Sequence, residues 1–402
     1  MMQYNMSRVE YNLDRQEFVL GEFVFDLKGL YAYLERLNDG RDPRGVRYQL
    51  ADALTLIILA KLGGEDEPRG MADWLRHRAE VLVRALKLAR ASMPHAVTIS
   101  RILGRAVDVE ELERVLARYL DGQVQTSQAI VVAIDGKVLR GTIEVGHSQG
   151  LHLLAAYLPE EGLVLMQVEV DNQANEIVAA PNFVEVLDLR VKVVVGDAMH
   201  TQRNISMEIV SHGGDYIWTA KGNQAEVQET IAHLFEPEPV TPGFAPTPTD
   251  FESASTVDKG HGRLERRTLT SSRMLKDYLD WPYLEQVFKL ERRFTHLKTG
   301  EVTLQISYGL TSLSPDQASP EQLLHYLRTY WGIENGLHYR RDVTFKEDQC
   351  RLRIGHAART MATLNNLVLT LILRQGYTNV PDARRRYAAR PLDALKLIFQ
   401  QP

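Results

Sequence analysis

Residues 129–137 read AIVVAIDGK, an apolar run that leads into an acidic residue and a glycine. A continuous apolar run of this length is typical of a short buried strand, and the Asp-Gly pair indicates a turn after it. The same pattern recurs in VKVVVGD at residues 191–197. We therefore predict two buried strands, one ending at Asp135 and the other at Asp197.

The elements around these two strands have a recognisable order. Residues 151–170 contain two apolar runs around the turn signal PEEG, residues 175–189 and 201–211 have helical patterning, and DYIWTA at 215–220 is a further strand. Strand, hairpin, helix, strand, helix, strand is the order of a ribonuclease-H-like mixed sheet. A doubly wound nucleotide-binding sheet is the competing fold, but it would not begin with a hairpin, and no G-x-G-x-x-G follows the first strand.

The remaining patterns divide the chain into regions. Helical spacing of apolar residues extends from residue 27 to residue 120, and five prolines crowd between residues 237 and 248. We predict an α/β protein whose catalytic core is the ribonuclease-H-like mixed sheet, with a β-rich insertion and an N-terminal helical domain. The predicted regions are a helical N-terminal domain (1–127), the first part of the core (128–235), the insertion (236–318), and the C-terminal part of the core with a basic helical tail (319–402).

The amino-acid composition is that of a globular protein. The chain has 402 residues, of which 44% are hydrophobic and 25% are charged, as in ordinary globular proteins of more than one domain. The single cysteine, Cys350, excludes an intrachain disulfide and a cysteine-based zinc site. No apolar run approaches the roughly 18 residues that would span a bilayer, and the amino terminus lacks the apolar core of a signal peptide. We expect a cytoplasmic protein without a membrane partner.

The charge distribution is uneven. The formal net charge is -5, but residues 226–258 hold seven acids and no lysine or arginine, so the rest of the chain is net positive. Two basic regions, 69–105 and 340–402, would suit a polyanionic partner. The segment HAVTISRILGRAV at 95–107 predicts the second helix of a helix-turn-helix, which would present Arg101 to DNA. The alternative is a short helix on an ordinary arginine-rich surface.

The two strand-end acids could form a metal site. In a ribonuclease-H-like sheet the strands that end at Asp135 and Asp197 are neighbours, so their carboxylates would converge at one edge. Hard oxygen ligands favour Mg²⁺ or Mn²⁺, and two such ions can catalyse displacement at a phosphodiester. Glu334, in the largely apolar and aromatic segment YWGIEN at 330–335, is the candidate third acid. The alternative for each aspartate alone is a turn or cap residue.

Six motifs in this order resemble those of the DDE transposases of bacterial insertion sequences, in the branch associated with H-repeats. The resemblance extends from about residue 23 to residue 397. The motifs are DPRGVRYQL (42–50), IDGKVLRG (134–141), GDAMHTQ (196–202), TAKGNQ (219–224), HGRLERR (261–267) and YWGIENGLHYRRDVTFKED (330–348). The resemblance implies that Asp135, Asp197 and Glu334 are the catalytic, metal-binding triad, with Mg²⁺ or alternatively Mn²⁺ as cofactor.

One part of the pattern departs from the related superfamily. Its Tyr, Arg, Glu, Lys signature is spaced differently here, since Tyr326 and Arg328 precede Glu334, and Arg341 stands where lysine is usual. We expect Trp331 to pack in the core, with base stacking as the alternative. The candidate DNA-binding residues are Arg101, Lys137, Arg140, Lys221, Asn223, Gln224, Arg340 and Arg341, each of which could equally be an ordinary surface or structural side chain.

The resemblance implies an enzyme that cleaves the ends of an insertion sequence and joins the freed 3′-hydroxyl to target DNA. Its partners would be double-stranded DNA, as terminal repeats and as target, and a second copy of the chain, since two ends must be joined. When bound to DNA it would be associated with the nucleoid. The alternatives are a metal-dependent nuclease without strand transfer, and a non-catalytic DNA-binding protein derived from a transposase.

Overall fold

The computed structural model describes residues 9–12, 17–20, 23–26, 29–121, 129–143, 146–147, 149–170, 187–237, 248–260 and 262–399. The helix predicted over 175–189 lies outside these ranges apart from its last three residues. None of the described helices is long and apolar enough to cross a membrane.

The amino-terminal region begins with three short strands that are not predicted from the sequence. β1 (Val9–Asn12), β2 (Glu17–Leu20) and β3 (Phe23–Asp26) form an antiparallel sheet in that order. At four residues each, they are too short for alternation to mark them in the sequence.

The predicted N-terminal helices follow these strands. Every residue of α2 is buried, so it is the core of this region, and it ends at Gly63. The helical stretch that begins at Pro68 is broken at Arg78 into two helices. The helices are α1 (Leu30–Leu34), α2 (Leu50–Leu62), α3 (Pro68–His77), α4 (Ala79–Leu86), α5 (Ala96–Arg101), the π-helical turn η2 (Ile102–Ala106) and α6 (Val109–Asp121).

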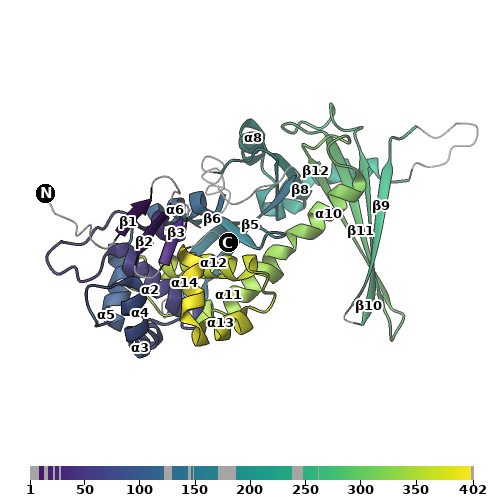
Figure 1. Ribbon diagram of the computed structural model, residues 1–402. Coiled ribbons are helices and arrows are strands. Elements are labelled where there is room, and N and C mark those ends of the chain that lie inside the picture. The colour runs from purple at the N-terminus through teal and green to yellow at the C-terminus, as the bar shows by residue number, and fades with distance from the viewer. Residues whose placement is uncertain are drawn as a thin grey trace, which may run out of the picture.

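A mixed sheet forms the centre of the molecule (Figure 1). Its first five strands lie in the order β6-β5-β4-β7-β8, in which β4, β5 and β6 are antiparallel neighbours and β4, β7 and β8 are parallel. This order confirms the ribonuclease-H-like mixed sheet. The strands are β4 (Ile130–Leu139), β5 (Leu151–Leu158), β6 (Leu163–Val170), β7 (Lys192–Gly196) and β8 (Asp215–Ala220), and α8 (Arg203–Ser211) connects the last two.

The β-rich block extends the same sheet. After α9 (Ala225–Leu234), the strands β9 (Glu252–Gly260), β10 (Arg263–Ser272), β11 (Gln286–His296) and β12 (Val302–Thr311) are antiparallel neighbours. The inner end of β12 pairs with β8, from Tyr308 opposite Ala220 to Thr311 opposite Ile217. Within the described residues the sheet is therefore nine-stranded. The outer ends of β9, β10 and β11 project from the molecule on the side away from the N-terminal helices (Figure 1), while α10 contacts β9 and β10.

The C-terminal helices return to the core and pack beside the N-terminal ones (Figure 1). In α12, the buried Arg359 joins three elements, because its guanidinium contacts Glu113 of α6 at 2.7 Å and Glu169 of β6 at 3.1 Å. A buried charge pair of this kind holds the helices in one position on the sheet, since separating it would leave a charge unpaired. The helices are α10 (Pro320–Tyr330), the π-helical η6 (Ile333–His338), α11 (Tyr339–Val343), the 3₁₀ turn η7 (Glu347–Gln349), α12 (Ala357–Arg374), α13 (Val380–Ala389) and α14 (Pro391–Phe399).

The junction between β8 and β12 depends on Gly309, and we expect Gly309→Val to destabilise it. A Cβ atom at this position would lie 2.3 Å from the backbone oxygen of Trp218 and 2.2 Å from the ring of Phe288. Overpacking of this kind lowers the free energy of unfolding by about 1–3 kcal/mol. Urea unfolding measures the change. Gly260→Val is the matched control, because a Cβ there meets nothing within 4 Å; equal effects of the two variants would contradict the prediction.

Candidate active site

Asp135 and Asp197 lie on neighbouring strands at the same edge of the sheet. β4 and β7 are parallel, and their last paired residues are Ile134 and Gly196, so the two aspartates follow at the next position of each chain. β4 is longer than predicted, because it continues to Leu139 against β5. Asp135 thus lies within β4, at the point where its pairing with β7 stops.

Asp197 carries a negative charge that its neighbours stabilise. It is the N-cap of the short 3₁₀ turn η4 (Ala198–His200) and accepts a hydrogen bond of 2.7 Å from the backbone N–H of Ala198. The ammonium of Lys221 lies 3.0 Å from its Oδ1. Burial by itself raises the pKa of Asp197, but the Ala198 N–H and Lys221 together outweigh it, so the pKa lies below its usual value. Its carboxylate is therefore available to a cation at neutral pH.

Asp135 is held by a histidine that the sequence did not single out. His338 Nε2, in η6, lies 3.1 Å from Asp135 Oδ2, and the imidazole is nearly buried. Two residues along β4, Lys137 forms an ion pair with Asp342 of α11 and lies 3.8 Å from Asp348. The η6–α11 segment therefore lies along β4. No spacing in the sequence marks His338, because the contact depends on the packing of η6 against β4.

Glu334 is exposed, at the start of η6. Its helix contacts the sheet closely: a Cβ atom on Gly336 would lie 2.7 Å from the hydroxyl of Tyr157 in β5. In the described part of the chain, no three His, Cys, Asp or Glu side chains are grouped as a metal site. Asp135 and Asp197 follow paired strand residues at one edge, and carboxylate oxygens are of the kind that Mg²⁺ prefers. Glu334 is on the adjacent helix and is not grouped with them.

Three predicted DNA-binding residues surround Asp197. Besides the Lys221 ammonium on its carboxylate, Asn223 donates a hydrogen bond of 2.6 Å to the backbone oxygen of Ala198, and Gln224 donates one of 3.0 Å to that of Thr201. The two amides therefore hold the loop after β8 against the segment that follows Asp197. They position Lys221 at the edge of the sheet.

The other predicted DNA-binding residues differ in accessibility. The Lys137 side chain is only 9% exposed and is ion-paired, whereas that of Arg140 is 79% exposed. Arg340 is half-buried and donates to the backbone oxygen of Gly336, and Arg101 is exposed at the end of α5. The burial of Arg341 contradicts its predicted DNA contact. Its guanidinium is completely buried and bonds Glu347 at 2.7 Å and Gln167 at 3.2 Å, so it joins α11 to η7 and β6.

Trp331 corrects a further expectation. Its side chain is 54% exposed, so the prediction that it packs in the core is wrong. Ile333 and Leu337 take the core positions of this segment, which turns Trp331 outward toward β11. There the guanidinium of Arg292 lies 5.6 Å from the centre of its ring.

Comparison with known proteins agrees with this architecture. The family model "Transposase DDE domain" matches residues 126–371, and the model "DDE_Tnp_1-associated" matches residues 31–120. The chain belongs to the DDE transposase family. Its relatives place it in the H-repeat-associated branch.

Two relatives illustrate this placement. "Putative transposase YncI" of Escherichia coli O157:H7 is 29% identical over 352 residues, which cover 86% of this chain and 87% of the relative. "H repeat-associated putative transposase YhhI" of Escherichia coli (strain K12) is 25% identical over 354 residues, or 86% of this chain and 91% of the relative. A solved structure titled "Cryo-EM structure of piggyBac transposase synaptic complex with hairpin DNA (SNHP)" aligns over 90% of this chain and 79% of its own, with a TM-score of 0.44 and 11% identity.

Lys221→Met tests the electrostatics at Asp197. Removing the ammonium takes away a favourable charge and a hydrogen bond, so the pKa of Asp197 should rise toward or above its ordinary value, and the carboxyl should bind a proton at higher pH. A ¹³C NMR titration of the Asp197 carboxyl, without metal, measures the shift. Lys298→Met, in the exposed turn between β11 and β12, should leave that pKa unchanged. An Asp197 titration that is identical in wild type and Lys221→Met would contradict the assignment.

Proposed function

We propose that this protein cleaves DNA at the ends of its element and joins the freed 3′-hydroxyl to target DNA, with Asp135, Asp197 and Glu334 as a metal-binding triad. One observation carries the proposal: the two aspartates follow paired residues of parallel strands, so their carboxylates share an edge of the sheet. The helix that bears Glu334 lies against the same strand, as the contact between His338 and Asp135 demonstrates. Family membership supports the reaction class, and the placement of the two aspartates supports the choice of residues.

The three acids would hold Mg²⁺, with Mn²⁺ as an alternative, and the cation would supply Lewis-acid stabilisation of the oxygens at phosphorus. In both reactions one oxygen–phosphorus bond forms as another breaks, and no side chain becomes covalently attached. Asp197 contributes a carboxylate that stays ionised, because the Ala198 N–H and Lys221 stabilise its charge. His338 holds Oδ2 of Asp135, which orients that carboxylate at the edge.

Lys221 has a second part in the proposal. Its side chain is 59% exposed, and its ammonium forms an ion pair with Asp197. Before DNA and metal bind, this ammonium therefore compensates the negative charge of the Asp197 carboxylate. We propose that it turns to a phosphate oxygen of the DNA when a cation binds Asp197. Asn223 and Gln224 keep the base of this lysine in place through their bonds to the backbone after Asp197.

Glu334 completes the triad from a π-helical segment. The wider π turn is uncommon and is frequently found at functional sites, where it places side chains that a regular α-helix would direct elsewhere. We propose that DNA binding brings Glu334 to the aspartates and that two copies of the chain act together, since two element ends must be joined. The protein would then act in the cytoplasm, at the nucleoid.

Cleavage of a labelled duplex that carries the element's own end tests this function. We expect cleavage in Mg²⁺ and none in EDTA. Asp197→Ala and Glu334→Gln should each lower the rate by more than about 100-fold, because loss of a direct ligand should exceed the cost of losing a supporting one. The matched controls are Asp188→Asn, before β7 at the opposite end of the strand, and Glu321→Gln, exposed on α10. Both should cleave at the wild-type rate.

The same assay separates the alternatives. A precleaved end with a free 3′-hydroxyl and a supercoiled target reports joining. Metal-dependent cleavage without joining would identify a nuclease. Binding of the end without cleavage, equal in wild type and Asp197→Ala, would identify a non-catalytic DNA-binding protein. Cleavage that survives both triad substitutions would overturn the assignment of the acids.

A further inference from the structure

Three segments that are far apart in the sequence meet at one surface. They are the end of α5 with η2, the 3₁₀ turn η3 (Arg140–Thr142) that directly follows β4, and the loop at residues 350–356 between η7 and α12. The loop lies between the other two. The surface therefore joins the N-terminal helices to the catalytic sheet.

Two glycines permit this close approach. A Cβ atom on Gly104 of η2 would lie 2.1 Å from the backbone oxygen of Ile354, and one on Gly141 of η3 would lie 2.3 Å from that of Cys350. The loop is thus in backbone contact with both sides, and the His356 N–H donates a hydrogen bond of 3.2 Å to the Gly104 oxygen. Any larger side chain at either glycine would displace the loop.

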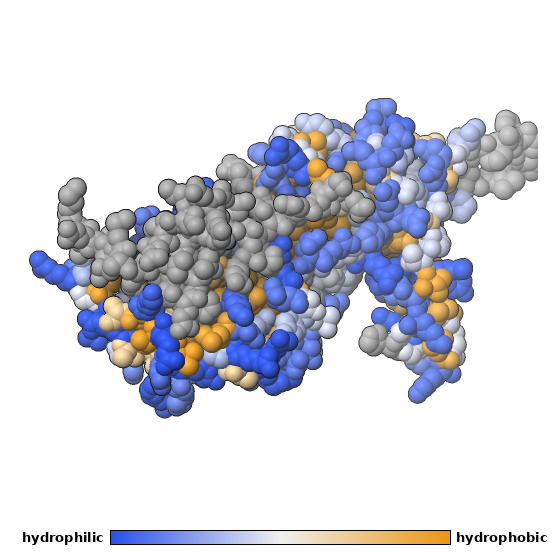
Figure 2. All heavy atoms as spheres, viewed as in Figure 1, coloured by the Kyte–Doolittle hydropathy of each residue, from blue (hydrophilic) through white to orange (hydrophobic). Residues whose placement is uncertain are grey.

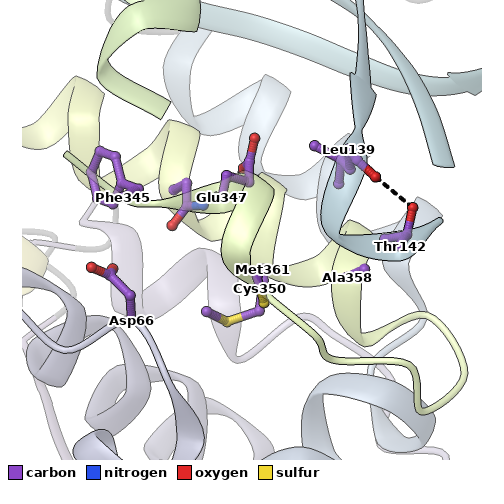
Figure 3. A pocket seen from close by; sticks show the side chains of 9 residues that line it. Asp66, Leu139, Thr142, Phe345, Glu347, Cys350, Ala358 and Met361 are labelled. Carbon is purple, nitrogen blue, oxygen red and sulfur yellow. Dashed lines mark hydrogen bonds between the residues drawn. The ribbon is translucent and has the colours of Figure 1, made fainter. Parts of the chain in front are cut away.

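The loop is also anchored from beneath. Cys350 and Met361 line one pocket with Leu139 at the end of β4, Thr142 of η3 and Glu347 of η7 (Figure 3). Thr142 donates a hydrogen bond of 2.7 Å to the Leu139 oxygen, which fixes the turn after β4. With its base anchored in this way, the loop leaves Arg351 and Arg353 exposed.

The exposed side chains around these contacts include five arginines. Each contact point is flanked by them: Arg105 and Arg353 adjoin the contact at Gly104, and Arg140 and Arg351 adjoin the contact at Gly141, with Arg101 one turn before Arg105. All five are exposed. Arg353 reaches across to the backbone oxygen of Ile143, so the loop arginines extend over η3.

Few acids balance this charge. Asp348 already lies within 4 Å of both Lys137 and Arg140, and Asp108 accepts hydrogen bonds from the first N–H groups of α6. Within the described residues, Arg101, Arg105 and Arg351 form no ion pair. Asp348 is shared between Lys137 and Arg140, so exposed arginines outnumber the acids that pair with them, and a polyanion would relieve the repulsion among them.

We propose that these arginines, which we call the arginine surface (Arg101, Arg105, Arg140, Arg351 and Arg353), bind the phosphate backbone of duplex DNA and lead it from the N-terminal helices to Asp135. The inference rests on the proposed function, and it adds the path that the DNA takes. Arg140 is five residues along from Asp135, or about 17 Å at the rise of an extended strand.

As a binding partner, duplex DNA suits this surface better than a protein whose acidic residues are scattered. It carries one negative charge for about every 1.7 Å of helix axis. Arginines on separate elements can therefore each contact a phosphate without a fixed spacing between them. The guanidinium fork bonds phosphate oxygens in pairs. Contacts of this kind position DNA without reading its sequence, so the surface should bind any duplex.

Binding of the full-length protein to a fluorescent 30-base-pair duplex tests the proposal. Anisotropy is measured in EDTA, which prevents cleavage, over a series of salt concentrations. In Arg351→Gln/Arg353→Gln, the slope of log K against log salt should fall in magnitude by about 1.8, since each lost phosphate contact removes about 0.9. Arg101→Gln/Arg105→Gln should do the same, because these arginines come from another segment. The effect should be equal for element-end and unrelated duplexes.

Arg293→Gln/Lys298→Gln, on β11 and the turn after it, is the matched control, as it removes the same charge from exposed positions outside both basic regions. It should keep the wild-type slope, and circular dichroism checks that all variants are folded. Wild-type slopes in both surface variants, or the same loss in the control, would overturn the arginine surface even if metal-dependent cleavage is found. A reduced slope confined to the surface variants, with no cleavage by wild type, would support the surface and refute the catalytic proposal.

Discussion

The pairing of β4 is the constraint on which the rest of the structure depends. β4 is antiparallel to β5 on one side and parallel to β7 on the other, and only the parallel side sets Ile134 opposite Gly196. A shift of one residue would turn Asp135 to the other face of the sheet and separate it from Asp197. The continuation of β4 against β5 then carries Lys137 to Asp342 and ends at the turn that meets the loop before α12.

Charge pairs fix the helices on this sheet. The pairs that hold elements together are buried, whereas other charged side chains remain accessible to solvent. Arg341 with Glu347, and Arg359 with Glu113, are buried and hold helices against β6 and each other. Asp197 with Lys221 is half-exposed and can exchange partners. Hydrophilic residues predominate among the coloured atoms on the face in Figure 2. On the projecting strands, apolar side chains such as Leu304 are exposed as well. Burial thus distinguishes the arginines that hold the helices together from the cations that remain accessible to solvent.

Much of the fold could be predicted because strands buried on both faces leave continuous apolar runs. The runs before Asp135 and Asp197 and the run DYIWTA correspond to β4, β7 and β8, and the hairpin signal corresponds to β5 and β6. The pairing of β12 with β8 could not be predicted, because the paired residues are 88 to 94 positions apart and no local pattern records the partner. The contact of His338 with Asp135 and the burial of Arg341 escaped prediction for the same reason.

By itself, the sequence determined the class of fold, the family and the acids proposed for catalysis, since these are recorded in local runs and in the residues that follow them. The tertiary structure alone decided which cations are accessible. Arg340 and Arg341 are adjacent in one motif, yet one is half-buried and the other completely buried. It also decided which distant arginines share a surface, because backbone contacts at Gly104 and Gly141 bring together segments that are more than 200 residues apart. Burial and contact depend on packing between distant segments, and no single stretch of sequence encodes them.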